Sequence, residues 1–260
     1  MFENIKTFRE KLSAGQLCIG TAITFSDPAV TEALCPSVDF VWIDLEHNPL
    51  GTDSMLAHLI AARAGGAAAL VRVPGSETSW IKRVLDAGSE GVIVPQVRSS
   101  EEVRQVVADS RYAPLGQRGY GPRRPSNYGR SAGKDYLREA NEAVFVVVQV
   151  ENAGALSQLD EIVAVRGLDS IVIGPYDLAA SLGHPGEINH PEVADAVKRI
   201  ISRSREADLF VGMGMMADVD TASRAAEMGV DWVQCGGDYA FLVESTTRFV
   251  AEVRARRSES

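Results

Sequence analysis

Cysteine is scarce in this sequence, and long apolar runs are missing. The 260 residues include three cysteines, Cys18, Cys35 and Cys235, and none of them forms a C-x-x-C pair. This set is typical of free thiols in a reducing compartment, so we expect a cytoplasmic protein. No apolar stretch reaches the about 18 residues of a membrane span, and the first residues lack the basic and apolar regions of a signal peptide. We therefore expect no membrane partner.

Positive charge is in deficit, and no linker divides the chain. The net charge of −9 argues against nucleic acid as a partner and suits a site that gathers a cation. No stretch rich in Pro, Gly or Ser and no block of like charge interrupts the sequence. With 45% hydrophobic and 23% charged residues, the composition is that of a soluble globular enzyme. We expect one domain over residues 1–260, a length that α/β barrels commonly have.

Apolar, strand-like runs recur eight times, and helical patterns follow nearly all of them. The runs are continuous, as expected for strands buried on both faces of a parallel sheet. This repeat predicts an α/β fold, a (β/α)8 TIM barrel. The alternative is a doubly wound open sheet, but no G-x-G-x-x-G follows the first strand. The expected strands are 17–25, 39–46, 68–74, 91–97, 144–151, 168–174, 209–215 and 230–236; the expected helices are 27–35, 51–64, 77–87, 99–110, 153–166, 191–206, 218–228 and 238–255.

Two segments lie outside this repeat. An amphipathic segment at 3–13 precedes the first strand, and we expect it to cover the bottom of the barrel. Residues 111–143 form an insert rich in Gly, Arg and Tyr after the fourth βα unit, with a short helix expected near 133–142. Such insertions shape the mouth of a barrel or a subunit interface.

Two acids end neighbouring strands. Glu151 closes the fifth expected strand and Asp177 follows the sixth. Parallel strands joined by a crossover helix usually lie side by side, so the two carboxylates should share one rim. Bare carboxylates at close range repel, and a divalent cation between them removes that conflict. Two unrelated surface acids are the alternative.

Three further polar residues stand at the ends of the second and third strands. His47 follows Asp44 by three residues, so a histidine–carboxylate pair can form and act as a general base. A rim histidine bonded to the backbone is the alternative. Arg72 ends a strand made otherwise of Ala, Leu and Val. It is either a clamp for a substrate carboxylate and oxyanion, or the partner of Glu46 or Asp44 in a salt bridge.

Lysine is missing from every expected strand end. A Schiff-base aldolase needs a desolvated lysine inside the barrel, so carbanion chemistry here must rely on a metal. The five lysines fall in expected helices or in the insert: Lys6, Lys11, Lys82, Lys134 and Lys198.

Five ordered motifs resemble those of the HpcH/HpaI aldolases. These are class II pyruvate aldolases, related to 4-hydroxy-2-oxoheptanedioate aldolase and 2-dehydro-3-deoxyglucarate aldolase. The resemblance covers nearly the whole chain and implies a metal-dependent barrel. Its reaction would cleave a 4-hydroxy-2-oxo acid to pyruvate and an aldehyde through a metal-bound pyruvate enolate. The motifs are IDLEHNP (43–49), LVRVP (70–74), GVIVPQ (91–96), QVE (149–151) and IGPYDLAASLG (173–183).

The resemblance implies roles for the catalytic and metal-binding residues. Glu151 and Asp177 would bind the metal, for which all-oxygen ligation suits Mg²⁺ or Mn²⁺, with Co²⁺ as a possible substitute. Arg72 would stabilise the enolate, and His47 paired with Asp44 would be the base. In the family an acid like Asp86 reaches the site of a neighbouring subunit, and the assembly is often a hexamer, a trimer of dimers.

The resemblance also implies how the substrate is held. Gln149 would lie beside the metal, and the backbone of Gly174, Pro175 and Tyr176 would bind the pyruvate carboxylate. The chain departs from the family at Leu45, where members commonly carry a small residue, and in the insert.

The insert is richer in Arg and Tyr than the family pattern. Arg118, Arg123 and Arg124 would recognise a second anionic group on the substrate, or would pair with acids of a neighbouring subunit.

Two other functions remain open at this stage. One is a glycosidase-type hydrolase that uses Glu46 and Glu151 as its two carboxylates. The other is a barrel without catalytic activity that serves as a binding or structural subunit.

Overall fold

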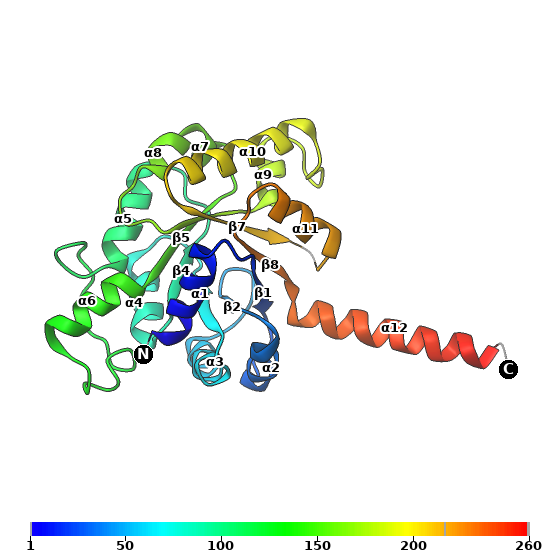
Figure 1. Ribbon diagram of the computed structural model, residues 1–260, viewed down its shortest axis with the longest axis horizontal. Helices are drawn as coiled ribbons and strands as arrows, with labels where there is room; N and C mark the ends of the chain where they lie inside the picture. Colours follow the sequence, from blue (N-terminus) through cyan, green and yellow to red (C-terminus); the bar gives the residue numbers. More distant parts are fainter. Residues whose placement is uncertain (1, 216, 259–260) are drawn as a thin grey trace.

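The computed structural model describes residues 2–215 and 217–258. Within these ranges eight parallel strands pair in sequence order, and β8 pairs with β1 to close a barrel (Figure 1). This architecture confirms the predicted (β/α)8 fold. The strands are β1 (Cys18–Ile23), β2 (Phe40–Asp44), β3 (Ala68–Arg72), β4 (Gly91–Val94), β5 (Phe145–Val150), β6 (Ser170–Ile173), β7 (Phe210–Met215) and β8 (Trp232–Gly237).

Helices surround the barrel, and one of them points away from it. The C-terminal helix α12 projects far from the strands instead of packing along them (Figure 1). None of the helices in the described ranges has the length and apolarity that crossing a membrane requires. The helices are α1 (Glu3–Ser13), α2 (Pro28–Leu34), η1 (Cys35–Ser37), α3 (Thr52–Gly65), α4 (Thr78–Ala87), α5 (Ser100–Ser110), α6 (Gly133–Ala143), α7 (Ala153–Ser157), α8 (Leu159–Val163), α9 (Pro175–Ser181), α10 (Pro191–Glu206), α11 (Val219–Glu227) and α12 (Asp238–Ser258).

On β2, β3 and β5 the side chains that point into the barrel change from apolar to polar along the strand. Successive residues of a strand face opposite sides of the sheet. On β2, Val41 and Ile43 therefore pack outward against the helices, while Phe40 and Trp42 pack inside the barrel. The next inward position is Asp44, at the carboxyl end. The same order holds on two other strands, with Ala68, Leu70 and Arg72 on β3 and Phe145, Val147 and Gln149 on β5.

Helix α1 covers the amino end of the barrel, as predicted. Its buried residues Ile5, Phe8 and Leu12 recur at helical spacing and form one apolar face. The Phe8 ring meets the rings of Phe40 and Phe145 edge-on, at centroid distances of 5.4 and 5.5 Å. Because Phe40 and Phe145 begin β2 and β5, these contacts place α1 across the amino ends of the strands.

The predicted helix over 153–166 was wrong in one respect, because the segment divides into α7 and α8. The break lies at Gln158, whose backbone (φ −109°, ψ 22°) leaves the helical range. The Gln158 side chain accepts a hydrogen bond from the backbone N–H of Ser100 at 3.1 Å, which ties the break to the start of α5.

The insert lies at the amino end of the barrel, beside α1. It joins α5 to β5, and a helix of this fold returns the chain to the amino end of the next strand. Lys6 of α1 forms an ion pair with Glu139 of α6 at 2.8 Å. Arg9 donates to the carbonyl of Val144 at 2.9 Å. The insert is therefore remote from the carboxyl ends of the strands in its own subunit.

Candidate active site

A cavity of about 510 Å³ opens at the carboxyl ends of the strands. Eight of the predicted site residues line it: Asp44, His47, Arg72, Gln149, Gly174, Pro175, Tyr176 and Asp177. They come from four different strands or the segments directly after them, which is how active sites of this fold are built. The structure thus brings together residues as far apart in sequence as 44 and 177.

Arg72 is fixed by two acids from the end of β2. The strand register places Asp44 opposite Arg72. Arg72 Nε donates to Asp44 Oδ1 at 2.8 Å, and Arg72 Nη1 lies 3.0 Å from Glu46 Oε2. The guanidinium also lies 5.2 Å from the centre of the Trp42 ring. Both salt bridges considered from the sequence are present, and they hold the guanidinium at the cavity.

The charge of Arg72 keeps Asp44 ionised. Burial alone would raise the pKa of Asp44, but the hydrogen bond and the charge of Arg72 outweigh it and hold that pKa below its ordinary value. Glu46 differs, because burial raises its pKa against the pull of Arg72 and His47, with Asp44 and Asp177 adding to the rise.

The structure shows no hydrogen bond between His47 and Asp44, and their pairing as the base stays a prediction. Asp44 Oδ1 accepts from Arg72 and from the backbone of Glu46, while Oδ2 accepts from Asn48 Nδ2 at 2.6 Å. Each oxygen of Asp44 therefore has a donor other than His47. His47 Nε2 lies instead 3.6 Å from Glu46 Oε2, and 63% of the His47 side chain is exposed. The strand ends at Asp44, so Glu46 and His47 do not have to point to opposite faces of a sheet.

Glu151 is buried behind the wall of the cavity. It is 2% exposed; its Oε1 accepts from the backbone N–H of Gln96 at 2.8 Å, and its Oε2 accepts from Gln149 Nε2. Burial raises the pKa of Glu151 to about 7; the Gln96 hydrogen bond opposes this rise, and the charges of Asp177 and Glu46 add to it. A cation relieves such an environment, in which a buried carboxylate has further acids around it.

The space beside Glu151 depends on a glycine. A Cβ on Gly174 would lie 2.6 Å from Glu151 Oε2 and 2.8 Å from Gln149 Nε2, so a larger residue would collide with both. Gln149 Oε1 is buried without a hydrogen-bond partner among the described residues. Carboxylates of Glu151 and Asp177 with this amide oxygen nearby form an all-oxygen donor set, which fits a hard divalent cation.

Helix α9 begins at the cavity and carries three predicted substrate-binding positions. Gly174 precedes its first turn, and Pro175 and Tyr176 belong to that turn together with Asp177. All four line the cavity. The first N–H groups of a helix have no partner within it, so they are available to an anionic group of a ligand.

The predicted binding of a substrate tail by Arg118 and Arg124 was wrong within one subunit. Arg118 is buried, pairs with Asp86 at 2.8 Å and stacks 4.6 Å from the Tyr112 ring. Arg124 is buried and donates to the carbonyl of Leu59 at 2.9 Å. Both lie at the amino end, because Asp86 ends α4 and the insert follows α5.

Arg123 and Asp86 also belong to the amino end. Arg123 is exposed there, so it cannot serve the cavity of its own subunit. The reach of Asp86 into a neighbouring subunit stays a prediction; its Oδ1 is bonded to Arg118 of the same chain.

Sequence reasoning gave no role to two residues that shape the site. Asn48 holds Asp44, and the residue stands inside the motif at 43–49. Asp238 accepts from Thr24 N, Thr24 Oγ1 and Phe25 N at 2.6 to 2.9 Å and ties the end of β1 to the end of β8. An acid directly after the last strand was the available signal for this role.

Residues 24–245 match the family model described as HpcH/HpaI aldolase/citrate lyase. The chain belongs to this family. The match covers β2 to β8 and all the cavity-lining residues except Ala22, and it confirms the resemblance drawn from the motifs.

Relatives of this HpcH/HpaI chain match it over almost its whole length. A 4-hydroxy-2-oxovalerate aldolase of Rhodococcus jostii is 39% identical over 250 residues, 95% of each chain. A hydroxypyruvate/pyruvate aldolase of Roseovarius nubinhibens is 36% identical over 251 residues, 95% of this chain and 96% of that protein. A solved HpcH/HpaI aldolase/citrate lyase family protein from Burkholderia cenocepacia is 31% identical, with a TM-score of 0.89 over 95% of this chain and 99% of that one.

The HpcH/HpaI chain is accordingly an enzyme. It is a class II pyruvate aldolase and therefore a carbon–carbon lyase, as its residues predicted. The two other functions considered from the sequence, a glycosidase and a barrel without activity, are not supported. Glu46, one half of the supposed glycosidase pair, is bound to Arg72.

Proposed function

We propose that this aldolase cleaves a short 4-hydroxy-2-oxo acid to pyruvate and an aldehyde, with the chemistry centred on Arg72 and His47 and a divalent cation held by Glu151 and Asp177. The observation that carries this proposal is the placement of Arg72. It is held at 2.8 and 3.0 Å by two acids and lies at the cavity that Gly174 lines, with Glu151 directly behind Gly174.

The cation would be Mg²⁺ or Mn²⁺, with Co²⁺ as a substitute, because the donors are oxygens. When bound, it would supply an electrophile next to the substrate oxygen that gains negative charge. Gln149, whose Oε1 is buried without a partner among the described residues, would orient Glu151 and lie beside the ion.

Arg72 would stabilise the charge that the reaction creates. When the C3–C4 bond breaks, its electron pair forms the C2–C3 double bond of the enolate, and the 2-oxo oxygen becomes negative. A guanidinium already held in place needs no reorganisation at that moment, and such fixed donors stabilise transition states strongly. At the start of α9, the backbone N–H groups of Gly174 and Tyr176 would bind the substrate carboxylate, with Pro175, which has no N–H, between them.

His47 would remove the proton from the C4 hydroxyl. Its imidazole lines the cavity and lies 3.6 Å from Glu46, so an acid is near enough to stabilise the protonated form. The enolate then takes a proton at C3, which yields the methyl group of pyruvate. His47→Ala should therefore abolish cleavage but spare enolate formation from pyruvate, because Arg72 remains.

The aldehyde half would be uncharged. Among the described residues that line the cavity, Arg72 is the one arginine or lysine, and the arginines expected to bind a second anion lie at the other end of the barrel. The relatives from Rhodococcus and Roseovarius carry names of substrates without a second carboxylate, whereas an Escherichia coli relative at 35% identity is named for a dicarboxylate, 5-keto-4-deoxy-D-glucarate, so the proposal rests on the cavity lining. A site with one fixed guanidinium has no partner for a distal carboxylate.

The test compares 4-hydroxy-2-oxo acids with and without a distal carboxylate, after exhaustive chelation and again after Mg²⁺ or Mn²⁺ is returned. We expect activity to require the added ion and kcat/KM to favour the substrate without the second carboxylate. Full activity in the chelated enzyme would contradict the role of the cation. A preference for the dicarboxylate would contradict the uncharged aldehyde while leaving the reaction type intact.

A homo-oligomer completes the proposal. Helix α12 is about 32 Å long at the usual rise per residue and carries the exposed apolar residues Leu242, Val243, Phe249 and Val253. An isolated helix gains little stability in water, and exposed apolar faces mark contact sites. We propose that a second copy of this chain covers α12, in a hexamer of paired barrels. Phe249→Asp should reduce the mass measured by light scattering, whereas Glu252→Gln on the same helix should not.

A further inference from the structure

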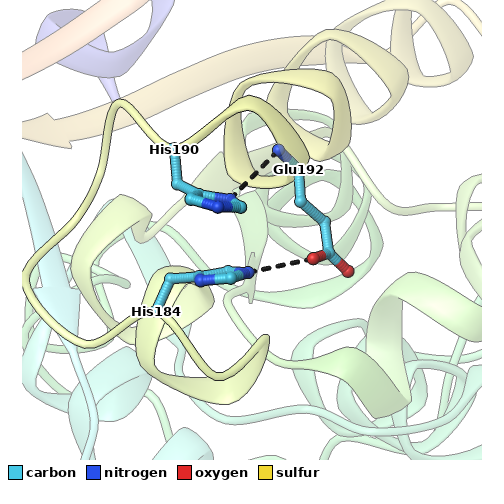
Figure 2. A group of neighbouring side chains, drawn as sticks. All are labelled: His184, His190 and Glu192. Atoms are coloured by element: carbon cyan, nitrogen blue, oxygen red, sulfur yellow. Dashed lines mark hydrogen bonds and ion pairs between the residues drawn. The ribbon is translucent and has the colours of Figure 1, made fainter.

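A cluster of three potential metal ligands lies outside the cavity, between α9 and α10. His184 follows α9, His190 caps the amino end of α10, and Glu192 belongs to the first turn of α10 (Figure 2). Among residues 2–215 and 217–258, these three form the group whose potential ligand atoms all lie within 4.8 Å of one another. We propose that His184, His190 and Glu192 bind a transition-metal ion of the Zn²⁺ class, separate from the cation of the active site.

The segment between the helices folds so that the two histidines meet. Three successive turns return the chain on itself: His184 N donates to Ala179 O at 2.8 Å, Glu187 N to His184 O at 3.0 Å, and His190 N to Glu187 O at 2.9 Å. Gly183 and Gly186 adopt left-handed backbone conformations (φ +88° and +83°) that a residue with a Cβ rarely adopts. The turns therefore stack the His184 and His190 rings, with centroids 3.4 Å apart and planes at 17°.

Glu192, on α10, faces the two histidine rings and is the third member of the group. His184 Nε2 lies 2.9 Å from Glu192 Oε2, and the Glu192 backbone N–H donates to His190 Nδ1 at 3.3 Å (Figure 2). One carboxylate oxygen and the nitrogens of two rings thus share a small volume at the surface. All three side chains are at least partly exposed, so an ion can enter from solvent.

The donor types select the metal. Two imidazoles and one carboxylate are a ligand set that Zn²⁺ takes in proteins, with water in the fourth position. Imidazole nitrogen also favours Co²⁺, Ni²⁺ and Cu²⁺ over Mg²⁺, which prefers oxygen. The active site offers the carboxylates of Glu151 and Asp177. The oxygen donors there would favour Mg²⁺, and the histidines of the second site would favour Zn²⁺.

Binding needs a small change of the His190 side chain. The planes of the stacked rings are nearly parallel, so the lone pairs of their nitrogens do not point at one common position. A Zn²⁺ ion needs both lone pairs to point at it, with Zn–N distances of about 2.0 to 2.1 Å. A turn of the His190 ring toward His184 Nε2 and Glu192 achieves this. The bound ion would then link the end of α9 to the start of α10. Since α9 also carries Tyr176 and Asp177, the ion would stiffen one wall of the cavity.

Co²⁺ binding in the presence of excess Mg²⁺ tests the proposal, because Mg²⁺ fills the oxygen site and Co²⁺ reports nitrogen ligands by its visible absorption. We expect the metal-free full chain to bind one equivalent of Co²⁺ with this absorption. Zn²⁺ at about a hundred-fold excess over Kd should raise Tm by roughly 5–10 °C.

The variants separate this site from other histidines. In the double variant His184→Asn with His190→Asn the absorption and the Tm shift should be lost; Asn is a good helix cap, so α10 should still begin at residue 191. Glu192→Gln should weaken binding, and Glu187→Gln, in the same loop but outside the group, should bind Co²⁺ like the wild type. Unchanged Co²⁺ absorption in both the double variant and Glu192→Gln, or no such absorption in the wild type, would overturn the proposal.

Discussion

A buried glutamate with a raised pKa lies at each end of the barrel, and the two differ in what surrounds them. Burial raises the pKa of Glu90 at the amino end and of Glu151 at the carboxyl end to about 7. Glu90 accepts backbone hydrogen bonds from Ile5 and Ala69, and the charge of Arg124 lowers its pKa. Glu151 instead lies behind a cavity and near other acids. A raised pKa alone therefore does not identify a reactive carboxylate; neighbouring negative charge and an open cavity do.

Exchanging each glutamate for glutamine should separate the two ends most clearly. Glu151→Gln keeps an oxygen for the Gln96 N–H but loses the charge that would hold the proposed cation. We expect kcat/KM to fall by roughly a thousand-fold or more, about 4 kcal/mol, with a folded barrel by circular dichroism. In Glu90→Gln, kcat of the folded enzyme should stay within about twofold. Equal losses of activity in both variants would remove the functional distinction between the ends.

Phe8→Ala tests the amino end as a source of stability. Phe8 is buried between Phe40 and Phe145, so its removal leaves a cavity that the closed barrel cannot easily fill. We expect the free energy of unfolding to fall by about 3–5 kcal/mol in urea denaturation, with kcat unchanged for the molecules that remain folded. The exposed Leu115→Ala, in the insert at the same end, should change it by less than about 0.5 kcal/mol.

Substitution of an arginine should also have different effects at the two ends of the barrel. In Arg72→Lys the fork that joins Asp44 and Glu46 is lost, so kcat and kcat/KM should fall together by roughly a hundred-fold or more, about 3 kcal/mol. Arg118→Lys disrupts the pair with Asp86 and should lower stability while leaving kcat unchanged. Steady-state kinetics and urea denaturation of both variants measure this. An unchanged kcat in Arg72→Lys would limit Arg72 to a structural role.

The pH dependence of stability isolates Glu90. Its pKa is about 7 in the folded chain and 4.5 ordinarily, so the folded state binds the proton more tightly than the unfolded state. The stability that this proton contributes is complete below pH 4.5 and is lost as the pH rises to about 7, by at most about 3 kcal/mol. Glu90→Gln should remove this slope. The free energies of unfolding of the variant and the wild type should be measured across this pH range. If the pKa of Glu90 in the folded chain is not near 7, the difference between the two proteins will not change with pH.

Much of the fold and part of the site could be predicted from residue patterns. Every second residue of a strand points into the barrel. After the inward residues Phe40 and Trp42, the next inward position is Asp44, which therefore lies at the carboxyl end of β2. The strand ends therefore predicted which residues gather at the cavity. The place of the insert was also readable, because a segment between a helix and the next strand lies at the amino end in this fold. The arginine content of the insert suggested a role in substrate binding, although the topology of the fold places the insert at the amino end of the barrel.

The partners of individual side chains could not be predicted in the same way. Asp44 has His47, Asn48, Glu46 and Arg72 within reach, and spacing along the chain does not rank them. The choice follows from the register of β2 and β3, which sets Arg72 opposite Asp44, and from the end of the strand before Glu46. Only the folded arrangement decides between such alternatives.

The first helix of the chain acquires its partners late in protein synthesis. Arg9 of α1 binds the carbonyl of Val144, 135 residues further along, and the Phe8 ring packs on Phe145. At usual translation rates the ribosome needs on the order of ten seconds to make that length of chain. During this time Phe40 is already available to Phe8, but the cover that Phe145 gives to the apolar face of Ile5, Phe8 and Leu12 is still missing. Losses to aggregation in the cell therefore depend on these three residues in a way that equilibrium measurements on the finished barrel do not register.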